Sequence, residues 1–182
     1  MRRRFLLIEN PRAGGGRREF LERCIAALVK RGASVERVAP ESAAHTREAA
    51  RDAANSEIYE ALIVAGGDGT IRQAASGLVG RALPFGIIPV GTGNVLAAEL
   101  RLPRDPWALA GYLTGGKAHA ATGGTANGEL FLFMTGVGLD AEIVARLHPE
   151  LARRIGKSAY SPAILSALAG APRTRLTVRL GQ

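Results

Sequence analysis

The hydrophobic residues of this chain fall into short apolar runs separated by stretches with helical spacing. Apolar runs predict strands over residues 4–9, 34–40, 60–65 and 84–90. Apolar positions spaced three and four apart, or alanine-rich stretches, predict helices over residues 20–29, 45–54, 71–79 and 95–100. A regular strand–helix alternation is typical of a parallel sheet covered on both faces. The pattern therefore predicts an α/β fold, with a three-layer parallel-sheet domain.

Three of these strands run directly into glycine-rich turns. The turns are Asn10-Pro11-Arg12-Ala13-Gly14-Gly15-Gly16, Ala65-Gly66-Gly67-Asp68-Gly69-Thr70 and Gly91-Thr92-Gly93-Asn94. Glycine permits a positive φ and lets an anion approach main-chain N–H groups without a Cβ in the way. Ligands bind parallel sheets at the carboxyl ends of the strands, and all three turns follow such ends. Together the turns predict a phosphate-binding edge.

The central turn adds two polar side chains to this edge. We expect Thr70 to cap the helix over residues 71–79, whose free N–H groups then face the ligand. Asp68 places a carboxylate in an anion-attracting turn, which makes sense if a divalent cation bridges it to phosphate. Nucleotide-phosphate binding with Mg²⁺ is the prediction. For this motif taken alone, a purely structural strand-to-helix turn is the alternative.

Two common nucleotide-binding motifs are absent from the sequence. Gly156-Lys157-Ser158 has Leu151 where a P-loop needs its first glycine, and this excludes a P-loop NTPase. The first turn also lacks the Gly-x-Gly-x-x-Gly pattern of dinucleotide-binding folds. The predicted phosphate site is therefore of another kind.

The pattern changes after residue 115. Asp105-Pro106 begins a helix that Gly115-Gly116 closes, and we expect the nucleotide-binding domain to end there. Residues 116–182 are predicted to form an incomplete β-rich second domain. Strands are predicted over residues 117–121, 129–135 and 173–180, with helices over 141–146, 150–155 and 163–169. With so few strands its edges stay exposed, so we expect the chain to dimerise or aggregate through this unit.

Charge and composition narrow the choice of partner. The formal net charge is +8, which suits an anionic partner such as a phosphate ligand or an acidic membrane. The alternative is that the scattered arginines form a solvated surface without a specific partner. Aromatic residues make up only 5% of the chain, which disfavours nucleic-acid binding. The single cysteine, Cys24, fits a buried position and a reducing compartment. Since no apolar run approaches the length of a membrane span, we expect a cytoplasmic, peripherally membrane-associated protein.

The ordered set of motifs resembles the diacylglycerol kinase catalytic-domain family, which includes sphingosine kinases and bacterial lipid kinases. The resemblance rests on Asn10-Pro11-x-Ala13-Gly14, Gly66-Gly67-Asp68-Gly69-Thr70, Pro89-Val90-Gly91-Thr92-Gly93-Asn94 and Gly136-Val137-Gly138-Leu139-Asp140-Ala141. It runs from about residue 4 to the last residue. The resemblance implies an ATP-dependent kinase that transfers the γ-phosphoryl group to a hydroxyl of diacylglycerol or a related sphingoid-type lipid at an anionic membrane surface.

The same resemblance assigns roles to individual residues. Asp68 is implied to be catalytic and to serve Mg²⁺ through the phosphate. Residues 116–182 are implied to bind the lipid substrate, with Asp140 in contact with the lipid head group. The nucleotide-binding set it implies is Asn10, Pro11, Gly14, Gly66, Gly67, Gly69, Thr70, Gly91, Thr92, Gly93 and Asn94. ATP and Mg²⁺ are the implied cofactors.

The sequence also departs from that family. Val95 stands where many members have an aspartate, and Ala98 where many have an arginine. Family chains normally continue through a fuller β-rich domain to a late acidic residue proposed as general base, so we expect either a fragment or a protein that lacks that part. Two alternatives stay open: an NAD kinase-like enzyme, which would need an Asn-Glu pair that this chain lacks, and a truncated nucleotide-binding module without turnover.

Overall fold

The computed structural model describes residues 1–11, 17–147, 158, 160–170 and 177. By compactness the chain divides into two units, Met1–Phe133 and Met134–Gln182. Each unit is described by itself. The predicted domain boundary at residue 115 stays a prediction, but a short hairpin that follows it belongs to the first compact unit.

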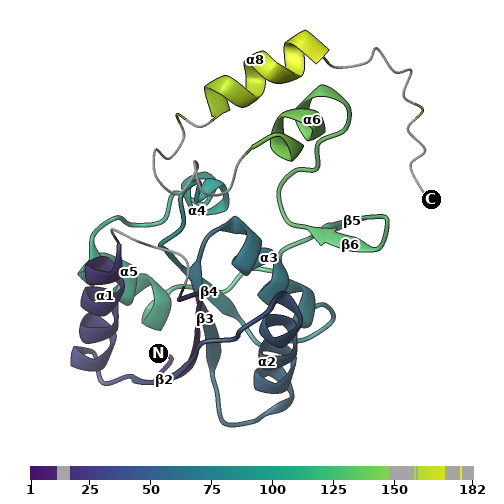
Figure 1. Ribbon diagram of the computed structural model, residues 1–182. Coiled ribbons are helices and arrows are strands. Elements are labelled where there is room, and N and C mark those ends of the chain that lie inside the picture. The colour runs from purple at the N-terminus through teal and green to yellow at the C-terminus, as the bar shows by residue number, and fades with distance from the viewer. Residues whose placement is uncertain (12–16, 148–157, 159, 171–176, 178–182) are drawn as a thin grey trace. The chain divides into compact units, whose positions relative to one another are not determined.

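A four-stranded parallel sheet forms the centre of the first unit (Figure 1). Its strands are β1 (Arg4–Glu9), β2 (Ser34–Val38), β3 (Ala61–Gly66) and β4 (Phe85–Pro89). The order across the sheet is β2-β1-β3-β4, with Leu7 opposite Ile63 and Val64 opposite Ile87 in the register. All six residues of β3 are buried, which explains why its sequence carries no polar side chain. The predicted strands and their parallel pairing are confirmed.

Helices cover both faces of this sheet and complete three layers (Figure 1). They are α1 (Arg18–Lys30), α2 (Ala43–Asn55), α3 (Asp68–Gly77), α4 (Val95–Glu99) and α5 (Pro106–Gly115). One face packs on α1 and α5 through Phe5, Leu28 and Leu109, and the other on α2 and α3 through Leu6, Ala50 and Ile71. Because successive strand residues point to opposite faces, neighbours such as Phe5 and Leu6 serve the two layers in turn.

Local sequence signals fix several of the helix ends. Ser42 accepts the His45 N–H and caps α2, and Asp105 accepts the Ala108 N–H and caps α5 ahead of Pro106. Cys24 is fully buried in α1, and burial raises the pKa of its thiol to about 12. It is therefore a small apolar core residue, as its place in the helical pattern predicts.

The hairpin that ends the first unit is shorter than predicted. Strands β5 (Gly124–Ala126) and β6 (Glu129–Phe131) pair antiparallel around Asn127 and Gly128, both with a positive φ. This is the Asn-Gly signature of a two-residue turn. The strand predicted over residues 117–121 is wrong, because that stretch carries no regular structure, and the strand predicted over 129–135 ends at Phe131.

In the second unit the described residues form two helices, α6 (Leu139–Ala145) and α8 (Tyr160–Gly170), which pack on each other. The helix predicted over residues 141–146 begins two residues earlier, and the one over 163–169 begins at Tyr160. The helix predicted over 150–155 and the strand over 173–180 lie outside the described residues, apart from position 177.

Candidate active site

The turns after β1, β3 and β4 lie next to each other, because these three strands are neighbours in the sheet. Main-chain hydrogen bonds between neighbouring strands continue to the first residue after β1 and the first residue after β4. The Asn10 N–H donates to the Ala65 carbonyl oxygen at 3.1 Å, and the Val90 N–H donates to the Gly66 oxygen at 3.3 Å. The structure thus brings Asn10, the first residue of the first turn, to the same edge as the second and third turns. Of the first turn, Asn10 and Pro11 are described, whereas Gly14 lies outside the described residues.

The central turn is shorter than the sequence suggests. Helix α3 begins at Asp68 with Gly67 as its N-cap, so the expectation that Thr70 caps a helix starting at Ile71 is wrong. Thr70 instead lies in the first helical turn, where its Oγ1 accepts a hydrogen bond of 3.1 Å from Asn10 Nδ2. Asn10 and Thr70 therefore join the first turn to the second through their side chains.

Two glycines of the central turn, Gly66 and Gly67, are needed for close packing rather than for a positive φ, whereas a Cβ on Gly69 would meet nothing within 4 Å. Gly67 has φ −92° and ψ 179°, an extended conformation that any residue adopts, so the positive φ that glycine permits is not used at this position. A Cβ on Gly66 would lie 2.7 Å from Thr70 Cβ, and a Cβ on Gly91 would collide with the Gly67 Cα. The second and third turns therefore pack backbone against backbone, with no room for side chains.

The left-handed residue of this site is an asparagine. Asn94 has φ 51° and is buried, and its side chain closes the third turn. Its Oδ1 accepts the Gly91 N–H at 2.9 Å while its Nδ2 donates to the Gly91 oxygen at 2.7 Å. Asparagine tolerates this conformation better than most residues. The buried Asn94 side chain thus fixes the shape of the third turn. Thr92 and Gly93 are the exposed residues of this turn.

The Asp68 carboxylate lies between the second and third turns. Its Oδ2 accepts the Val95 N–H at 3.1 Å and its Oδ1 accepts the Leu96 N–H at 3.0 Å, both from the start of α4. The sequence analysis did not predict this contact. The donors are main-chain N–H groups of two apolar residues, and the side chains of those residues give no sign of it. A carboxylate has about four acceptor positions, so two are left for water or a cation.

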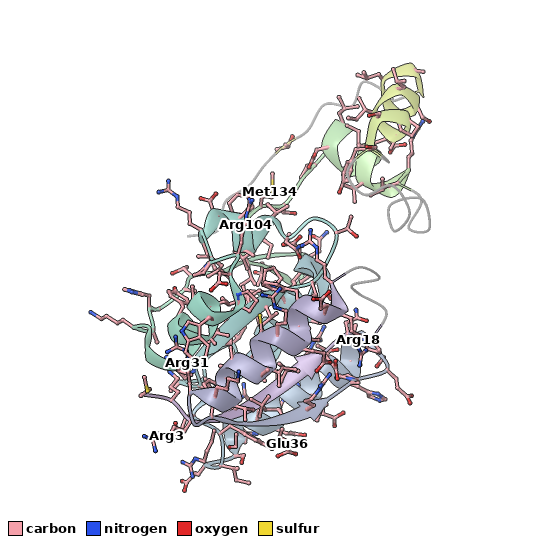
Figure 2. All side chains as sticks on the ribbon, turned by 90° about the vertical axis from the view of Figure 1, so that its left-hand side faces the viewer. Arg3, Arg18, Arg31, Glu36, Arg104 and Met134 are labelled. Atoms are coloured by element: carbon pink, nitrogen blue, oxygen red, sulfur yellow. The ribbon has the colours of Figure 1, made fainter. Side chains whose placement is uncertain are left out.

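One basic side chain reaches across the same edge. Arg17, which precedes α1, donates from Nη1 to the Pro89 carbonyl oxygen at the end of β4 at 3.3 Å. Its remaining N–H groups are exposed beside the turns. Figure 2 shows further basic residues on the α1 side of the first unit: Arg18 begins α1 directly after Arg17, whereas Arg31 follows the far end of that helix. The edge thus combines free helix N–H groups with positive charge, both of which attract anions.

Asp140 belongs to the second unit. It is the second residue of α6 and its side chain is exposed. A Cβ on Gly136 would collide with the Asp140 carboxylate, and Gly138, the N-cap, has φ 78°. The structure therefore explains why glycine stands at both positions of the motif Gly136-Val137-Gly138-Leu139-Asp140. They let the chain turn tightly around the carboxylate and begin the helix that carries it.

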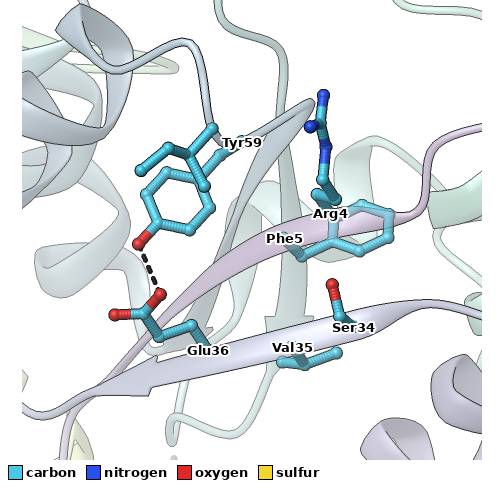
Figure 3. Close-up of a pocket in the computed structure, with 7 residues that line it drawn as sticks. Arg4, Phe5, Ser34, Val35, Glu36 and Tyr59 are labelled. Atoms are coloured by element: carbon cyan, nitrogen blue, oxygen red, sulfur yellow. Dashed lines mark hydrogen bonds between the residues drawn. The ribbon is translucent and has the colours of Figure 1, made fainter.

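A hollow of about 280 Å³ lies at the opposite edge of the sheet, near the first residues of β1 and β2 (Figure 3). Its lining residues are Arg4, Phe5, Ser34, Val35, Glu36, Ile58 and Tyr59. The Tyr59 hydroxyl donates to Glu36 at 2.6 Å, and this hydrogen bond raises the pKa of Tyr59. Neither the predicted site residues nor the described part of the glycine-rich turns line this hollow. Its other polar side chains also have partners: Ser34 donates to the Arg3 carbonyl oxygen, and Arg4 pairs with Glu60.

The metal-binding potential of the site rests on Asp68. Among the described residues no group of three or more His, Cys, Asp and Glu side chains is placed to hold an ion. Mg²⁺ commonly takes one or two protein carboxylates and completes its shell with phosphate oxygens and water. The two acceptor positions left on Asp68 fit that manner of binding.

In the part of the chain that is described, no helix is long and apolar enough to span a bilayer.

The chain matches a family model described as the diacylglycerol kinase catalytic domain over residues 4–126. It is 32% identical over 165 residues to a diacylglycerol kinase of Bacillus subtilis, covering 87% of this chain and 53% of that protein. It is 36% identical over 104 residues to a probable YegS-like lipid kinase of Pseudomonas aeruginosa, covering 56% of this chain and 34% of that one.

Solved structures of diacylglycerol kinases also superpose on this chain. A crystal structure of a putative diacylglycerol kinase from Bacillus anthracis superposes with a TM-score of 0.67 at 28% identity, covering 81% of this chain and 52% of that one. A second diacylglycerol kinase structure from the same organism gives a TM-score of 0.62 at 26% identity. The chain spans about half the length of the Bacillus relatives.

Proposed function

The chain belongs to the diacylglycerol kinase catalytic-domain family, and on that premise we propose that it acts as an ATP-dependent lipid kinase. The proposed reaction transfers the γ-phosphoryl group of ATP to a hydroxyl of diacylglycerol or a related sphingoid-type lipid. The observation that carries the proposal is the meeting of the glycine-rich turns at one edge of the sheet, where backbone packs on backbone.

This edge suits the phosphates of a nucleotide. Helix α3 starts there with its first N–H groups free, and its positive dipole end favours phosphate charge. Gly69 and Thr92 are exposed at the turns, and Arg17 adds a guanidinium. Phosphoryl transfer depends mainly on positioning and on neutralising charge, which such groups supply. The contacts that hold the turns together at this edge come from Asn10, Gly66, Gly67, Gly91 and Asn94.

Mg²⁺ belongs to this proposal as the partner of Asp68, where it would neutralise the phosphate charge. Asp140, exposed at the start of α6, is the proposed contact to the lipid head group. The net charge of +8 supports peripheral adsorption to an anionic membrane, at up to about 1 kcal/mol per basic residue near the surface. Sedimentation with phosphatidylserine vesicles should therefore fall steeply as salt rises.

The test has a binding arm and a transfer arm. Calorimetry of the 182-residue chain should detect binding of ATP with Mg²⁺, and Gly91→Val should abolish it, because the new side chain collides with Gly67. Gly115→Ala is the matched control, since a Cβ there meets nothing within 4 Å. Thermal melting followed by circular dichroism checks that each variant is folded.

In the transfer arm, ATP labelled on the γ-phosphate is offered with diacylglycerol, a sphingoid base and NAD. Label is expected on a lipid. Transfer to NAD alone would replace the lipid kinase with the NAD kinase alternative. Absence of ATP binding by the folded chain would refute the proposed function altogether.

A further inference from the structure

The Asp68 carboxylate joins two structural elements that are distant in sequence. Asp68 is the first residue of α3, yet both its oxygens accept N–H groups from the first two residues of α4, Val95 at 3.1 Å and Leu96 at 3.0 Å. The first N–H groups of a helix have no partner within it and need an acceptor from outside. Asn94, which precedes α4, directs its side chain to Gly91 instead. Asp68 therefore supplies the cap that the helix does not provide for itself.

The surroundings hold this carboxylate in place. A Cβ on Gly93 would lie 3.1 Å from Asp68 Oδ2, and one on Gly91 would collide with the Gly67 Cα. The third turn is thus packed against the carboxylate on one side and against the second turn on the other. Hydrogen bonds that involve an ionised group are about twice as strong as neutral ones. Two of them at a tightly packed junction restrict how the third turn can move.

We propose that Asp68 is a positioning residue for the third turn, Gly91–Asn94, and holds it against the second turn before nucleotide or metal binds. The role is additional to the metal partnership and rests on the proposed nucleotide site. Asp68 acts here through main-chain N–H groups, so its effect on nucleotide binding does not need Mg²⁺.

The two roles predict opposite results when Mg²⁺ is removed. If Asp68 serves only the metal, then without metal its charge merely repels the phosphates, and Asp68→Asn should leave ATP affinity unchanged or raise it. If Asp68 positions the turn, the same substitution should weaken ATP binding even in EDTA. Asparagine offers one acceptor oxygen and an NH₂ group that cannot accept, so either Val95 or Leu96 loses its partner.

The experiment compares parent and Asp68→Asn in two measurements. ATP dissociation constants are determined with Mg²⁺ and with EDTA, and hydrogen exchange of the Val95 and Leu96 amides is followed by NMR without nucleotide. We expect Asp68→Asn to weaken ATP binding in EDTA about tenfold or more and to speed exchange of at least one of the two amides by a similar factor. Asp105→Asn is the matched control, since Asp105 accepts an N–H at the start of α5, away from the turns.

Three results would overturn the positioning role. One is an ATP affinity in EDTA that Asp68→Asn leaves unchanged or increases. Another is equal exchange of both amides in parent and variant. The third is rapid, unprotected exchange of Val95 and Leu96 in the parent, which also decides the matter if the variant does not fold. A parent that binds no ATP would refute the proposed function instead, and the exchange data would still test the positioning role.

Discussion

The two units of this chain differ sharply in how they bury apolar side chains. The first unit has a continuous core on each face of its sheet, with Leu7, Ile63 and Leu28 fully buried. In the second unit the buried apolar side chains among the described residues are Ala163 and Ala167, whereas Leu165 is 69% exposed and Leu168 63%. The first unit thus has the interior of an independent domain, and the second presents apolar surface that needs a cover.

Separating the units should give the largest effect. We expect Met1–Phe133 to melt cooperatively without the rest, since its hairpin is tied to α3 by the Arg72–Glu129 ion pair and Leu132 packs on its core. We expect Met134–Gln182 alone to show no cooperative transition. Circular dichroism melting of both fragments checks this. A cooperative transition in the short fragment would show that its packing is stronger than the described contacts suggest.

Matched leucine substitutions test the contrast at single positions. Leu28→Ala should destabilise the protein by about 2–5 kcal/mol, because it opens a cavity in a fully buried site. Leu165→Ala, at an exposed site in α8, should change stability by less than about 0.5 kcal/mol. Urea unfolding of the full chain measures both. Similar losses for the two variants would mean that α8 is covered in solution, for example by a second copy of the chain, as light scattering would reveal.

Glycines at two helix ends compare packing in the two units. Gly77 ends α3 where it crosses α2, and a Cβ there would collide with the Arg47 carbonyl oxygen, so Gly77→Ala should cost about 1–3 kcal/mol. Gly170 ends α8, and its Cβ would lie 3.4 Å from the flexible end of Arg146. Gly170→Ala should change stability by less than about 0.5 kcal/mol. Equal unfolding midpoints for the two variants in urea would contradict the close crossing of α2 and α3.

The smallest effects should come from surface ion pairs. Arg37 donates to both Glu9 and Glu22 at the edge of the sheet, and its hydrogen bonds to Glu22 hold the pKa of that carboxyl below 4.5. Arg37→Met should cost up to about 1 kcal/mol at pH 7, whereas Arg146→Met, which removes a pair with Glu142, should cost about 0.3–0.5 kcal/mol.

The effect of Arg37 should depend on pH in one direction. Because the folded pKa of Glu22 lies below its unfolded value, the pair stabilises the protein above pH 4.5 and loses this contribution as the pH falls through the folded pKa. Stability curves of parent and Arg37→Met should therefore converge in acid. A difference that stays constant from pH 7 down to pH 3 would assign the effect of Arg37 to packing alone.

The sequence determined the order and type of the elements in the first unit. Runs such as Leu62-Ile63-Val64-Ala65 have no polar residue and are typical of a strand buried on both faces, which β3 is. Since strands in a parallel sheet all end at one edge, the meeting of the turns after β1, β3 and β4 was predictable as well. Caps such as Asp105 are local, because donor and acceptor lie three residues apart.

The tertiary structure alone decided how the site residues contact one another. Asp68 bonds the N–H groups of Val95 and Leu96, main-chain groups that every residue except proline carries, so no side-chain pattern announces the contact. The glycine requirement at Gly91 likewise comes from a neighbour in space, Gly67 of the second turn, rather than from a positive φ. Contacts of this kind depend on the distance between two packed turns, which is set only when the whole sheet has formed.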